Sequence, residues 1–372
     1  MIQLQEVKNK KDLKNFVTFP FSLYKDSKYW VPPIISDEVA TLSADKNPAF
    51  QHAEARYFLA YKNKQIVGRV AAIINWTEIN EQKVKKMRFG WFDTINDVDV
   101  SKALLNKVAE IGKEHKLEYI EGPVGFSNLD KNGALTEGFD HIGTMATWYN
   151  HAYYIDHLEQ LGYETEKEYI ESKFSFIDLP VERFVRANDI ILKRFKLKAG
   201  TFTTTKEIVP HLDSMFNLFN RSYSKLSSFV PISDAQRDYF KKKFINFINP
   251  EFIKFVFDEH DKMVAFAIVL PSFSEALQET NGKLFPFGFL KLLKAKKTSK
   301  TALFYLIGVE PQYQNKGVTA IIFNEFHKSF TKFGVETCIR LPELADNLAS
   351  HQIWKDFDTR IIKRRKTFKK VL

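Results

Sequence analysis

The order of predicted elements repeats once along this chain, and the repeat constrains the fold more than any other feature. In each half the apolar pattern predicts a strand, helices, a two-strand hairpin, a further strand, a helix, a strand and a helix. The two hairpins join residues 57–61 to 66–74 and residues 252–257 to 263–270, with Asn63 in the first turn. This order predicts an α/β (α+β) fold built from two copies of one unit.

The length of the chain also favours two domains. At 372 residues it exceeds the size at which a single hydrophobic core usually stops growing. We predict an N-terminal domain over residues 1–171 and a C-terminal domain over residues 172–372. Residues 172–197 connect the copies without a low-complexity linker, so we expect the two domains to pack across a sizeable interface.

The composition predicts a globular protein without a disulfide framework. Phe accounts for 35 of the 372 residues, a surplus of large apolar side chains to bury or to present to an apolar partner. Cys338 is the only cysteine, which excludes disulfides and thiolate metal sites within the chain. The N-terminus lacks the apolar core of a signal peptide, and no apolar run approaches the roughly 20 residues of a membrane span. We therefore expect a cytoplasmic protein.

A strand-to-helix turn over residues 309–320 has the properties of a phosphate-binding loop. The apolar run 303–309 predicts a buried strand before it, and large apolar residues recur every four positions in the helix after it. The first N–H groups of a helix lack intrahelical partners and lie at the positive end of its dipole, so they favour an anion. Gly317 lets the backbone approach a phosphate closely, and Lys316 adds positive charge. The alternative is an ordinary strand-to-helix turn.

The spacing of this loop resembles the acyl-CoA loop of the GNAT N-acyltransferase superfamily, which reads Gln or Arg, two residues, Gly, one residue, then Gly or Ala. Gln314 and Gly317 match, and Thr319 stands where Gly or Ala is usual. The resemblance covers nearly the whole chain, since both halves follow the GNAT order of elements. It implies two tandem GNAT-like domains, each a mixed, mostly antiparallel sheet flanked by helices. The activity that it implies is acyl-CoA-dependent N-acyl transfer to an amine, with acyl-CoA or acetyl-CoA as co-substrate and no metal.

The two copies differ at this loop. In the first copy, Asp97 and Asp99 align with Gln314 and Lys316, and the loop has no glycine. Two carboxylates would repel a diphosphate by several kcal/mol in a partly dry site. We therefore expect only the second copy to bind CoA. The stretches 281–288 and 307–311 further resemble a bacterial group of two-copy GNAT-like proteins that we connect with ceramide-forming N-acyltransferases.

In the GNAT superfamily the strand before the loop holds the pantetheine arm through its backbone, and the loop holds the diphosphate. Asn347, on the next helix, either caps that helix or contacts the ligand. The CoA-binding residues that the resemblance implies are Ile307, Gly308, Val309, Gln314, Asn315, Lys316, Gly317, Val318, Thr319, Ala320 and Asn347.

A general base and a general acid are the next requirements of this chemistry. We rank Glu310 first as the base, because it lies where the strand becomes the loop; a solvated turn carboxylate is the alternative. Glu343 and Asp346 are further candidates to deprotonate or orient the amine, and water can replace them all.

The tyrosine that usually serves as the acid is replaced by Trp354, whose indole cannot supply a proton. His351, Tyr223 or Tyr305 would then act as the acid. Two alternatives remain: the thiolate leaves unassisted, since a thiol has a pKa of only ~8.5, or catalysis has been lost.

The net charge of +10 is concentrated in two basic segments. Six lysines lie between Lys283 and Lys300, and the run 363–370 is also basic. Nucleic acid, an anionic membrane or the phosphates of CoA are the partners that this charge favours. No helix-turn-helix, zinc-finger or RNA-binding signature is present, so nucleic acid is the least favoured.

The acceptor is predicted from an insertion over residues 271–300, which the first half lacks. Within it, residues 284–300 set phenylalanines and leucines beside lysines, a composition typical of a segment in a membrane interface. The alternative packs the phenylalanines onto the domain with the lysines as a solvated rim. The interfacial interpretation predicts peripheral contact with the inner membrane face and an amphiphilic or amino-lipid substrate. Candidates to line the acceptor cleft are Tyr149, Asn150, Tyr153, Tyr154 and Asn220.

Two other classes of function stay open. A protein that binds acyl-CoA without turnover would explain Thr319 and Trp354 together. An aminoacyl-tRNA-dependent transferase would use the basic segments, and its binding to tRNA should fall steeply with salt.

Overall fold

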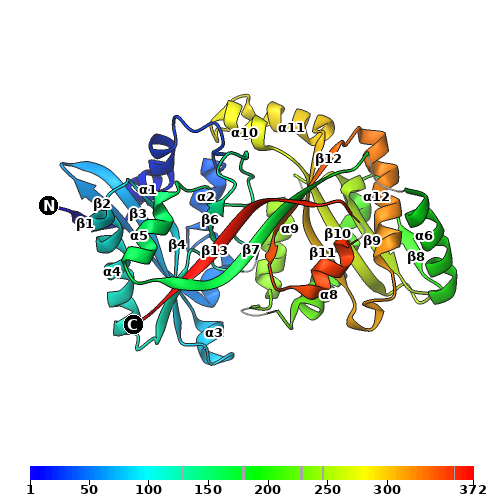
Figure 1. Ribbon diagram of the computed structural model, residues 1–372, viewed down its shortest axis with the longest axis horizontal. Coiled ribbons are helices and arrows are strands. Elements are labelled where there is room, and N and C mark those ends of the chain that lie inside the picture. The colour runs from blue at the N-terminus through cyan, green and yellow to red at the C-terminus, as the bar shows by residue number, and fades with distance from the viewer. Residues whose placement is uncertain (128, 178–180, 227–228, 245–246, 356) are drawn as a thin grey trace.

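Both halves of the chain contribute strands to one continuous sheet (Figure 1). The computed structural model describes residues 1–127, 129–177, 181–226, 229–244, 247–355 and 357–372. The first half comprises β1 (Gln3–Glu6), α1 (Lys10–Leu23), α2 (Ile35–Thr41), β2 (Ala53–Lys62), β3 (Gln65–Asn75), α3 (Trp76–Asn80), β4 (Lys86–Thr94), α4 (Val98–Glu114), β5 (Tyr119–Gly122), β6 (Ala134–Glu137), α5 (Tyr153–Gln160) and β7 (Glu164–Ser175). The second half comprises α6 (Val181–Phe195), β8 (Lys198–Gly200), α7 (Thr205–Ile208), α8 (Leu212–Tyr223), α9 (Asp234–Phe244), β9 (Ile253–Phe257), β10 (Met263–Pro271), α10 (Ser274–Thr280), α11 (Gly288–Thr298), β11 (Thr301–Val309), α12 (Thr319–Phe333), β12 (Thr337–Leu344), α13 (Leu348–Trp354) and β13 (Arg360–Val371).

The predicted fold is confirmed in its main elements. β2 and β3 form the first hairpin, and the two turn residues Asn63 and Lys64 have the positive φ values, 52° and 66°, that a two-residue turn favours. β9 and β10 form the second hairpin, and β11 runs into α12 through the predicted loop. α4 and α12 occupy corresponding places in the two halves, each connecting the two strands of a parallel pair, β4 with β5 and β11 with β12.

Helices cover both faces of the second half's sheet. Along β10 successive side chains point to opposite faces, as the two-residue period of a strand requires. Ala267 and Val269 pack in one core with α12, and Ile268 and Leu270 pack in another with α8. This arrangement explains why β10 is apolar along its whole length.

The last strand of each half lies beside strands of the other half. The sheet runs in the order β1-β2-β3-β4-β5-β13-β7-β12-β11-β10-β9-β8, with β6 paired to β13. β7, at the end of the first half, pairs with β12, whereas β13, the last element of the chain, pairs with β5. β7 and β13 also pair with each other, and they cross the middle of the molecule side by side (Figure 1). The domain boundary at residues 171 and 172 falls inside β7 and stays a prediction.

The basic run 363–370 lies in β13 and is only partly exposed. In β13 the side chains of Lys363 and Arg365 are buried, and Arg365 pairs with Glu171 of β7. Lys366 pairs with Glu168 at 3.1 Å. Acidic residues of the neighbouring strand therefore neutralise this run, as cross-strand pairs of opposite charge do.

The first half closes its own helix start with a carboxylate. Asp97 accepts a hydrogen bond from the N–H of Asp99 at 3.0 Å, and Lys62 pairs with Asp97 at 2.9 Å. The Asp97 carboxylate thus occupies the place at the N-terminus of α4 where a diphosphate would have to bind. This geometry supports the expectation that only the second copy takes the donor.

The insertion forms α10 and α11 on one side of the sheet (Figure 1). Phe285 and Phe287 precede α11 with 82% and 72% of their surfaces exposed, and Leu290 and Leu293 on α11 are exposed as well. No helix in the described ranges combines the length and the apolar character that crossing a bilayer requires.

Candidate active site

A cavity of about 200 Å³ lies where β11 and β12 diverge. The two strands pair in parallel only from Thr301 to Phe304 and from Thr337 to Arg340, after which they separate. The cavity is lined by Leu129, Asp130, Asn132, Ala146 and Tyr169 of the first half, and by Phe219, Tyr223, Leu226, residues 304–307, residues 340–344, Asn347, Ser350 and Trp354 of the second. Both halves therefore build one site.

The strand that leads to the loop carries an irregularity at Tyr305. Ile268 of β10 lies opposite Leu306, and Val269 lies opposite Phe304, so Tyr305 is an extra residue. Beyond it the carbonyl of Ile307 accepts the hydroxyl of Tyr223 at 3.0 Å. The bulge interrupts the regular pairing of β11 with β10 at the edge of the cavity, and the pairing resumes from Leu306 to Val309.

Contacts at the end of β11 explain the glycine at position 308 and the glutamine at position 314. The carbonyl of Val309 accepts the side-chain amide of Gln314 at 3.2 Å. Gly308 must lack a side chain, because a Cβ there would lie 2.3 Å from the ring of Phe266.

The loop between β11 and α12 is open to solvent. Gln314, Asn315, Lys316 and Gly317 are all exposed. In the described part of the chain, the N–H groups of Gly317, Val318 and Thr319 have no hydrogen-bond acceptor. Three unpaired donors at the start of a 15-residue helix form the anion site that the sequence predicts.

Helix α6 packs against one side of this loop. A Cβ on Gly317 would lie 2.7 Å from Cδ1 of Ile191, and the backbone of Gly317 has a φ of 77°. The ammonium group of Lys316 lies 5.5 Å from the ring centroids of Phe195 and Tyr313. Gly317 is thus required for packing and conformation, whether or not a phosphate binds.

A cluster of charged side chains forms the β12 side of the cavity. Glu343 pairs with Arg340 and accepts the hydroxyl of Ser350. Nε2 of His351 lies 4.0 Å from Oε1 of Glu343. Burial lowers the pKa of Arg340 to about 10, and its guanidinium lies 4.8 Å from the centroid of the Trp354 ring. Glu343 is held in place by these neighbours.

Two tyrosines stand on the β11 side. The hydroxyl of Tyr305 donates to the carbonyl of Leu129 at 3.0 Å. Burial raises the pKa of Tyr223 to about 12, and it also raises the pKa of Tyr305. Both phenols are protonated at neutral pH.

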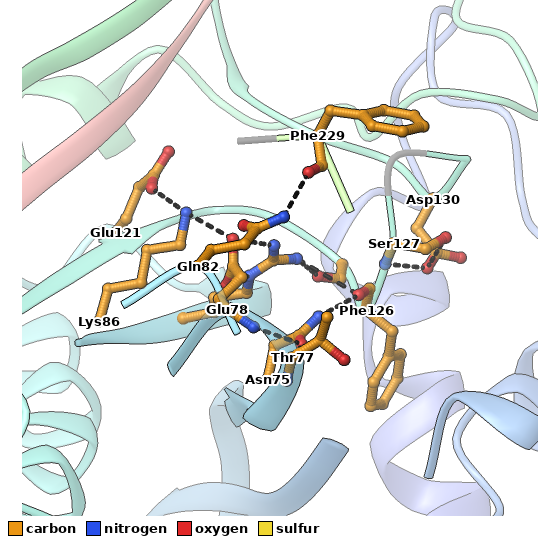
Figure 2. Close-up of polar contacts among 12 residues, drawn as sticks. Asn75, Thr77, Glu78, Gln82, Lys86, Glu121, Phe126, Ser127, Asp130 and Phe229 are labelled. Carbon is orange, nitrogen blue, oxygen red and sulfur yellow. Dashed lines mark hydrogen bonds and ion pairs between the residues drawn. The ribbon is translucent and has the colours of Figure 1, made fainter. Parts of the chain in front are cut away.

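Asp130 brings a second carboxylate from the first half. Its Oδ2 accepts the N–H and the hydroxyl of Ser127 at 2.8 and 3.0 Å (Figure 2). Burial raises the pKa of this carboxyl group, and the positive charge of Lys243 opposes the shift. Its backbone segment is anchored by the buried Arg88, which donates to the carbonyl of Gly125 at 2.8 Å.

The junction between the halves is closed by polar contacts around this segment. Gln82 of the first half donates to the carbonyl of Phe229 of the second half at 2.7 Å (Figure 2). Nearby, Lys86 lies between the carboxylates of Glu78 and Glu121, at 2.9 and 2.8 Å. Glu78 also pairs with Arg88, which holds the backbone of the loop that carries Asp130.

Comparison with known proteins shows which fold this geometry belongs to. No protein-family model matches the chain. Protein YghO of Escherichia coli (strain K12) is 29% identical over 317 residues, which are 84% of this chain and 80% of that protein. A protein named bacterial ceramide synthase, from Caulobacter vibrioides (strain NA1000 / CB15N), is 26% identical over 320 residues, 83% of this chain and 80% of its own length. A solved tandem GNAT protein from the clavulanic acid biosynthesis pathway matches with a TM-score of 0.59, covering 100% of this chain and 98% of that one at 9% identity.

The chain has a tandem GNAT fold. In the second copy, β11 and β12 diverge beside the loop before α12. In the first copy the corresponding helix start is closed by Asp97.

Several of the predicted residues lie at the cavity of the tandem GNAT fold. Ile307, Tyr223 and Asn347 line it, and the Asn347 side chain also caps α13 by accepting the N–H of Ser350 at 3.1 Å. His351 lies beside Glu343, one residue after Ser350.

Glu310 and Asn220 are engaged elsewhere. Both oxygens of Glu310 contact the guanidinium of Arg221 at 2.8 to 3.2 Å, and Glu310 is not among the lining residues. Asn220 forms hydrogen bonds with both backbone groups of Ile232, which fixes the segment before α9.

The four predicted acceptor residues of the first half lie within that half and do not line the cavity. The Asn150 side chain holds both backbone groups of Leu135, at 2.6 and 3.0 Å. Tyr153 and Tyr154 bond the backbone of Thr94, and the hydroxyl of Tyr149 donates to the carbonyl of Phe139 at 3.4 Å.

Sequence reasoning missed Asp130, Asn132, Arg340 and Ser350. Asp130 lies in no motif, and its distance along the chain from β11 gives no signal that the two meet. Arg340 reads as a polar interruption of an apolar strand, which was a weak indication of a site.

Proposed function

We propose that the protein is an N-acyltransferase that passes an acyl group from CoA to an amine bound between the two halves. The observation that carries this proposal is the cavity at which the open edge of β11 meets carboxylates from both halves. The name of the Caulobacter relative, a bacterial ceramide synthase, supports acyl transfer to a lipid amine.

The donor would lie along β11 and the loop before α12. The N–H groups of Gly317, Val318 and Thr319 would bind the diphosphate, with Lys316 adding charge. The backbone of Ile307 and Val309 would bind the pantetheine arm, which requires the side chains of Tyr223 and Gln314 to release the carbonyls that they now contact. These contacts would aim the thioester at the amine.

The acceptor would enter as an ammonium ion between Asp130 and Glu343. Asp130 is the better proton acceptor, because burial raises its pKa, whereas Glu343 is held by Arg340 and Ser350 and is suited to orient the amine. The neutral nitrogen then attacks the thioester carbonyl carbon, the C–N bond forms, and the C–S bond breaks. The nitrogen loses its remaining excess proton to water, because Asp130 already holds the first one.

The departing thiolate needs no acid from this chain. Proton transfer from Tyr223, with a pKa of about 12, to a thiolate with a pKa of ~8.5 would cost about 5 kcal/mol. Tyr223 is therefore suited to donate a hydrogen bond to the thiolate or to the developing oxyanion, and the thiolate takes its proton from solvent. On this basis the replacement of the usual tyrosine by Trp354 is compatible with turnover.

A two-stage experiment tests the proposal. Titration calorimetry of the purified chain with CoA should give a saturable heat, and thiol release from acyl-CoA should rise when a long-chain primary amine is added. An absence of CoA binding would refute the donor site. Binding without thiol release on a panel of amines would favour the non-catalytic acyl-CoA-binding protein.

The aminoacyl-tRNA alternative depends on two basic segments, and one of them is not available to bind tRNA. Acidic residues of β7 neutralise the run 363–370, so the exposed positive charge of the insertion is the basic segment that remains available. A single lysine-rich helix does not provide the extended basic groove that tRNA needs.

Helix α11 and the residues before it would bring the protein to an anionic membrane. Phe285 and Phe287 are largely exposed, and Lys283, Lys294 and Lys297 of the same segment are exposed as well. Exposed aromatic rings beside lysines suit insertion at the boundary between head groups and acyl chains, and each lysine near an anionic surface adds about 1 kcal/mol. A lipid amine would reach the protein from such a surface.

A further inference from the structure

A second cavity, apolar and about 40 Å³ in volume, lies beside the first. Its walls come from α8, α9, β9 and β10. They include Leu212, Met215, Phe216, Phe240, Ile268 and Leu270, all buried. Lys241 is the charged residue among the lining residues, and its ammonium group is paired with Asp213 and Asp238 at 2.5 and 3.0 Å. The lining thus offers a ligand apolar contacts and few polar ones.

The two cavities share a wall. Leu129, Tyr305 and Leu306 line both of them. The hydroxyl of Tyr305 is directed to the carbonyl of Leu129, so the phenol ring stands between the cavities as part of a bonded pair. Because Tyr305 is also the extra residue of β11, the strand is already irregular at this point.

The order of groups along β11 points to the occupant. A donor that follows the strand places its diphosphate at residues 317–319 and its pantetheine arm at Val309 and Ile307. Its thioester then arrives at Leu306, and whatever lies beyond the carbonyl carbon continues past Tyr305. The apolar cavity begins there, on the side of α8 and away from the charged β12 side that would hold the amine.

We propose that this cavity receives the alkyl chain of the acyl donor and so selects thioesters with a hydrocarbon tail over acetyl-CoA. The inference rests on the proposed function. An unfilled apolar cavity lowers stability, because the side chains that line it lose van der Waals contacts. Water does not fill it, because the apolar lining offers too few hydrogen-bond partners. Met215, with its flexible side chain, allows the walls to adjust to a chain that is longer than the cavity as it stands.

Titration calorimetry with CoA, acetyl-CoA, octanoyl-CoA and palmitoyl-CoA tests the assignment. With the unaltered chain, affinity should rise from acetyl-CoA to octanoyl-CoA, about fourfold for each methylene that becomes fully buried. Met215→Phe and Ile268→Phe fill the cavity from two different elements, and each should weaken octanoyl-CoA at least tenfold more than acetyl-CoA. Val209→Phe, a larger increase in bulk at an exposed position before α8, should leave the whole series unchanged.

The outcomes separate the two proposals. If CoA itself does not bind, the proposed donor site is wrong, and the proposed alkyl-chain cavity is wrong with it. CoA could bind while affinity is independent of the length of the alkyl chain, or both filled variants could bind octanoyl-CoA as tightly as the unaltered protein. Either result would show that the alkyl-chain cavity is wrong, and the donor site would stand. Thermal unfolding of each variant shows whether it is folded. If one of the filled variants does not fold, Phe216→Ala replaces it in the test. This variant enlarges the cavity and should shift the preference towards palmitoyl-CoA.

Discussion

The carboxylate of Glu310 and the guanidinium of Arg221 form a two-point ion pair that joins the end of β11 to the last turn of α8. Nη2 of Arg221 lies 2.8 Å from Oε2, and Nε lies 3.2 Å from both carboxylate oxygens. Arg221 is 46% exposed, so water screens the pair, and it should contribute no more than about 1 kcal/mol to stability.

Glu310→Gln separates a structural role from a role as general base. A carboxylate held at two points by a guanidinium must give up those contacts before it can accept a proton, so we expect thiol release to fall less than threefold in this variant. Arg221→Gln should have an equally small effect. A loss of a hundredfold or more in Glu310→Gln, with Arg221→Gln unaffected, would return Glu310 to the role of base.

Asp130→Asn should lower turnover and raise stability together. The folded-state pKa of Asp130 is raised by burial, so the stability that this carboxyl group supports is present at low pH and is lost as pH rises through the folded pKa. The amide removes that loss, so the variant should melt at a higher temperature than the unaltered chain at pH 7 and gain less at pH 3.

The same variant should release thiol at least a hundredfold more slowly with an amine acceptor. Asp140→Asn, the same change at an exposed position, is the control. Unchanged turnover in Asp130→Asn would contradict the assignment of the base.

Thr319→Glu tests the donor loop better than a change at Gly317. Any side chain at Gly317 meets Ile191 and a positive φ, so a loss of binding there would not report on phosphate alone. A carboxylate at position 319 stands at the helix start and repels a diphosphate, so CoA affinity should fall at least tenfold, which is 1.4 kcal/mol. Thr331→Glu, at the other end of α12, should bind CoA like the unaltered chain, and calorimetry compares the two.

Removal of two exposed rings should release the protein from anionic vesicles. Phe285→Ser with Phe287→Ser removes the most exposed rings before α11, and we expect co-sedimentation with phosphatidylglycerol vesicles to fall at least tenfold. Val371→Ser, at a comparably exposed position, is the control. Equal binding of all three proteins, or equal binding to neutral vesicles, would contradict the proposed membrane contact.

Breakage of the pair between Arg365 and Glu171 should destabilise both halves at once. Both side chains are buried, and Glu171→Ala leaves the guanidinium of Arg365 without its carboxylate, which costs about 3–5 kcal/mol. Because β7 and β13 belong to one sheet, we expect a single unfolding transition at a lower temperature, measured by calorimetry. Two separate transitions would show that the halves unfold independently.

The sequence predicted the elements whose local pattern is strong. The hairpin at Asn63 and Lys64 has both its alternation and its turn residues in one short stretch, and α12 repeats apolar residues with a helical period. β7 was not predicted, because its glutamates and lysines resemble a solvated segment until the basic β13 lies beside it. Its charges make sense only as half of a pair.

The candidate site was predicted in part for the same reason. The donor loop is contiguous in sequence, so its exposed N–H groups could be anticipated from residues 314–320. Asp130 enters the cavity through the packing of one half on the other, which no local pattern records. Glu310 has the right position along the chain, but its partner Arg221 lies on α8, which is far away in the sequence.

The place of β13 has a consequence for synthesis on the ribosome. The edge of β5 that β13 covers exists as soon as the first half has been made, yet β13 is translated only after the strands and helices of the second half that precede it. Until then the nascent first half carries an uncovered strand edge, a feature that invites mispairing with other chains. Chaperone dependence of the newly made protein should therefore last until β13 has been made and has paired with β5.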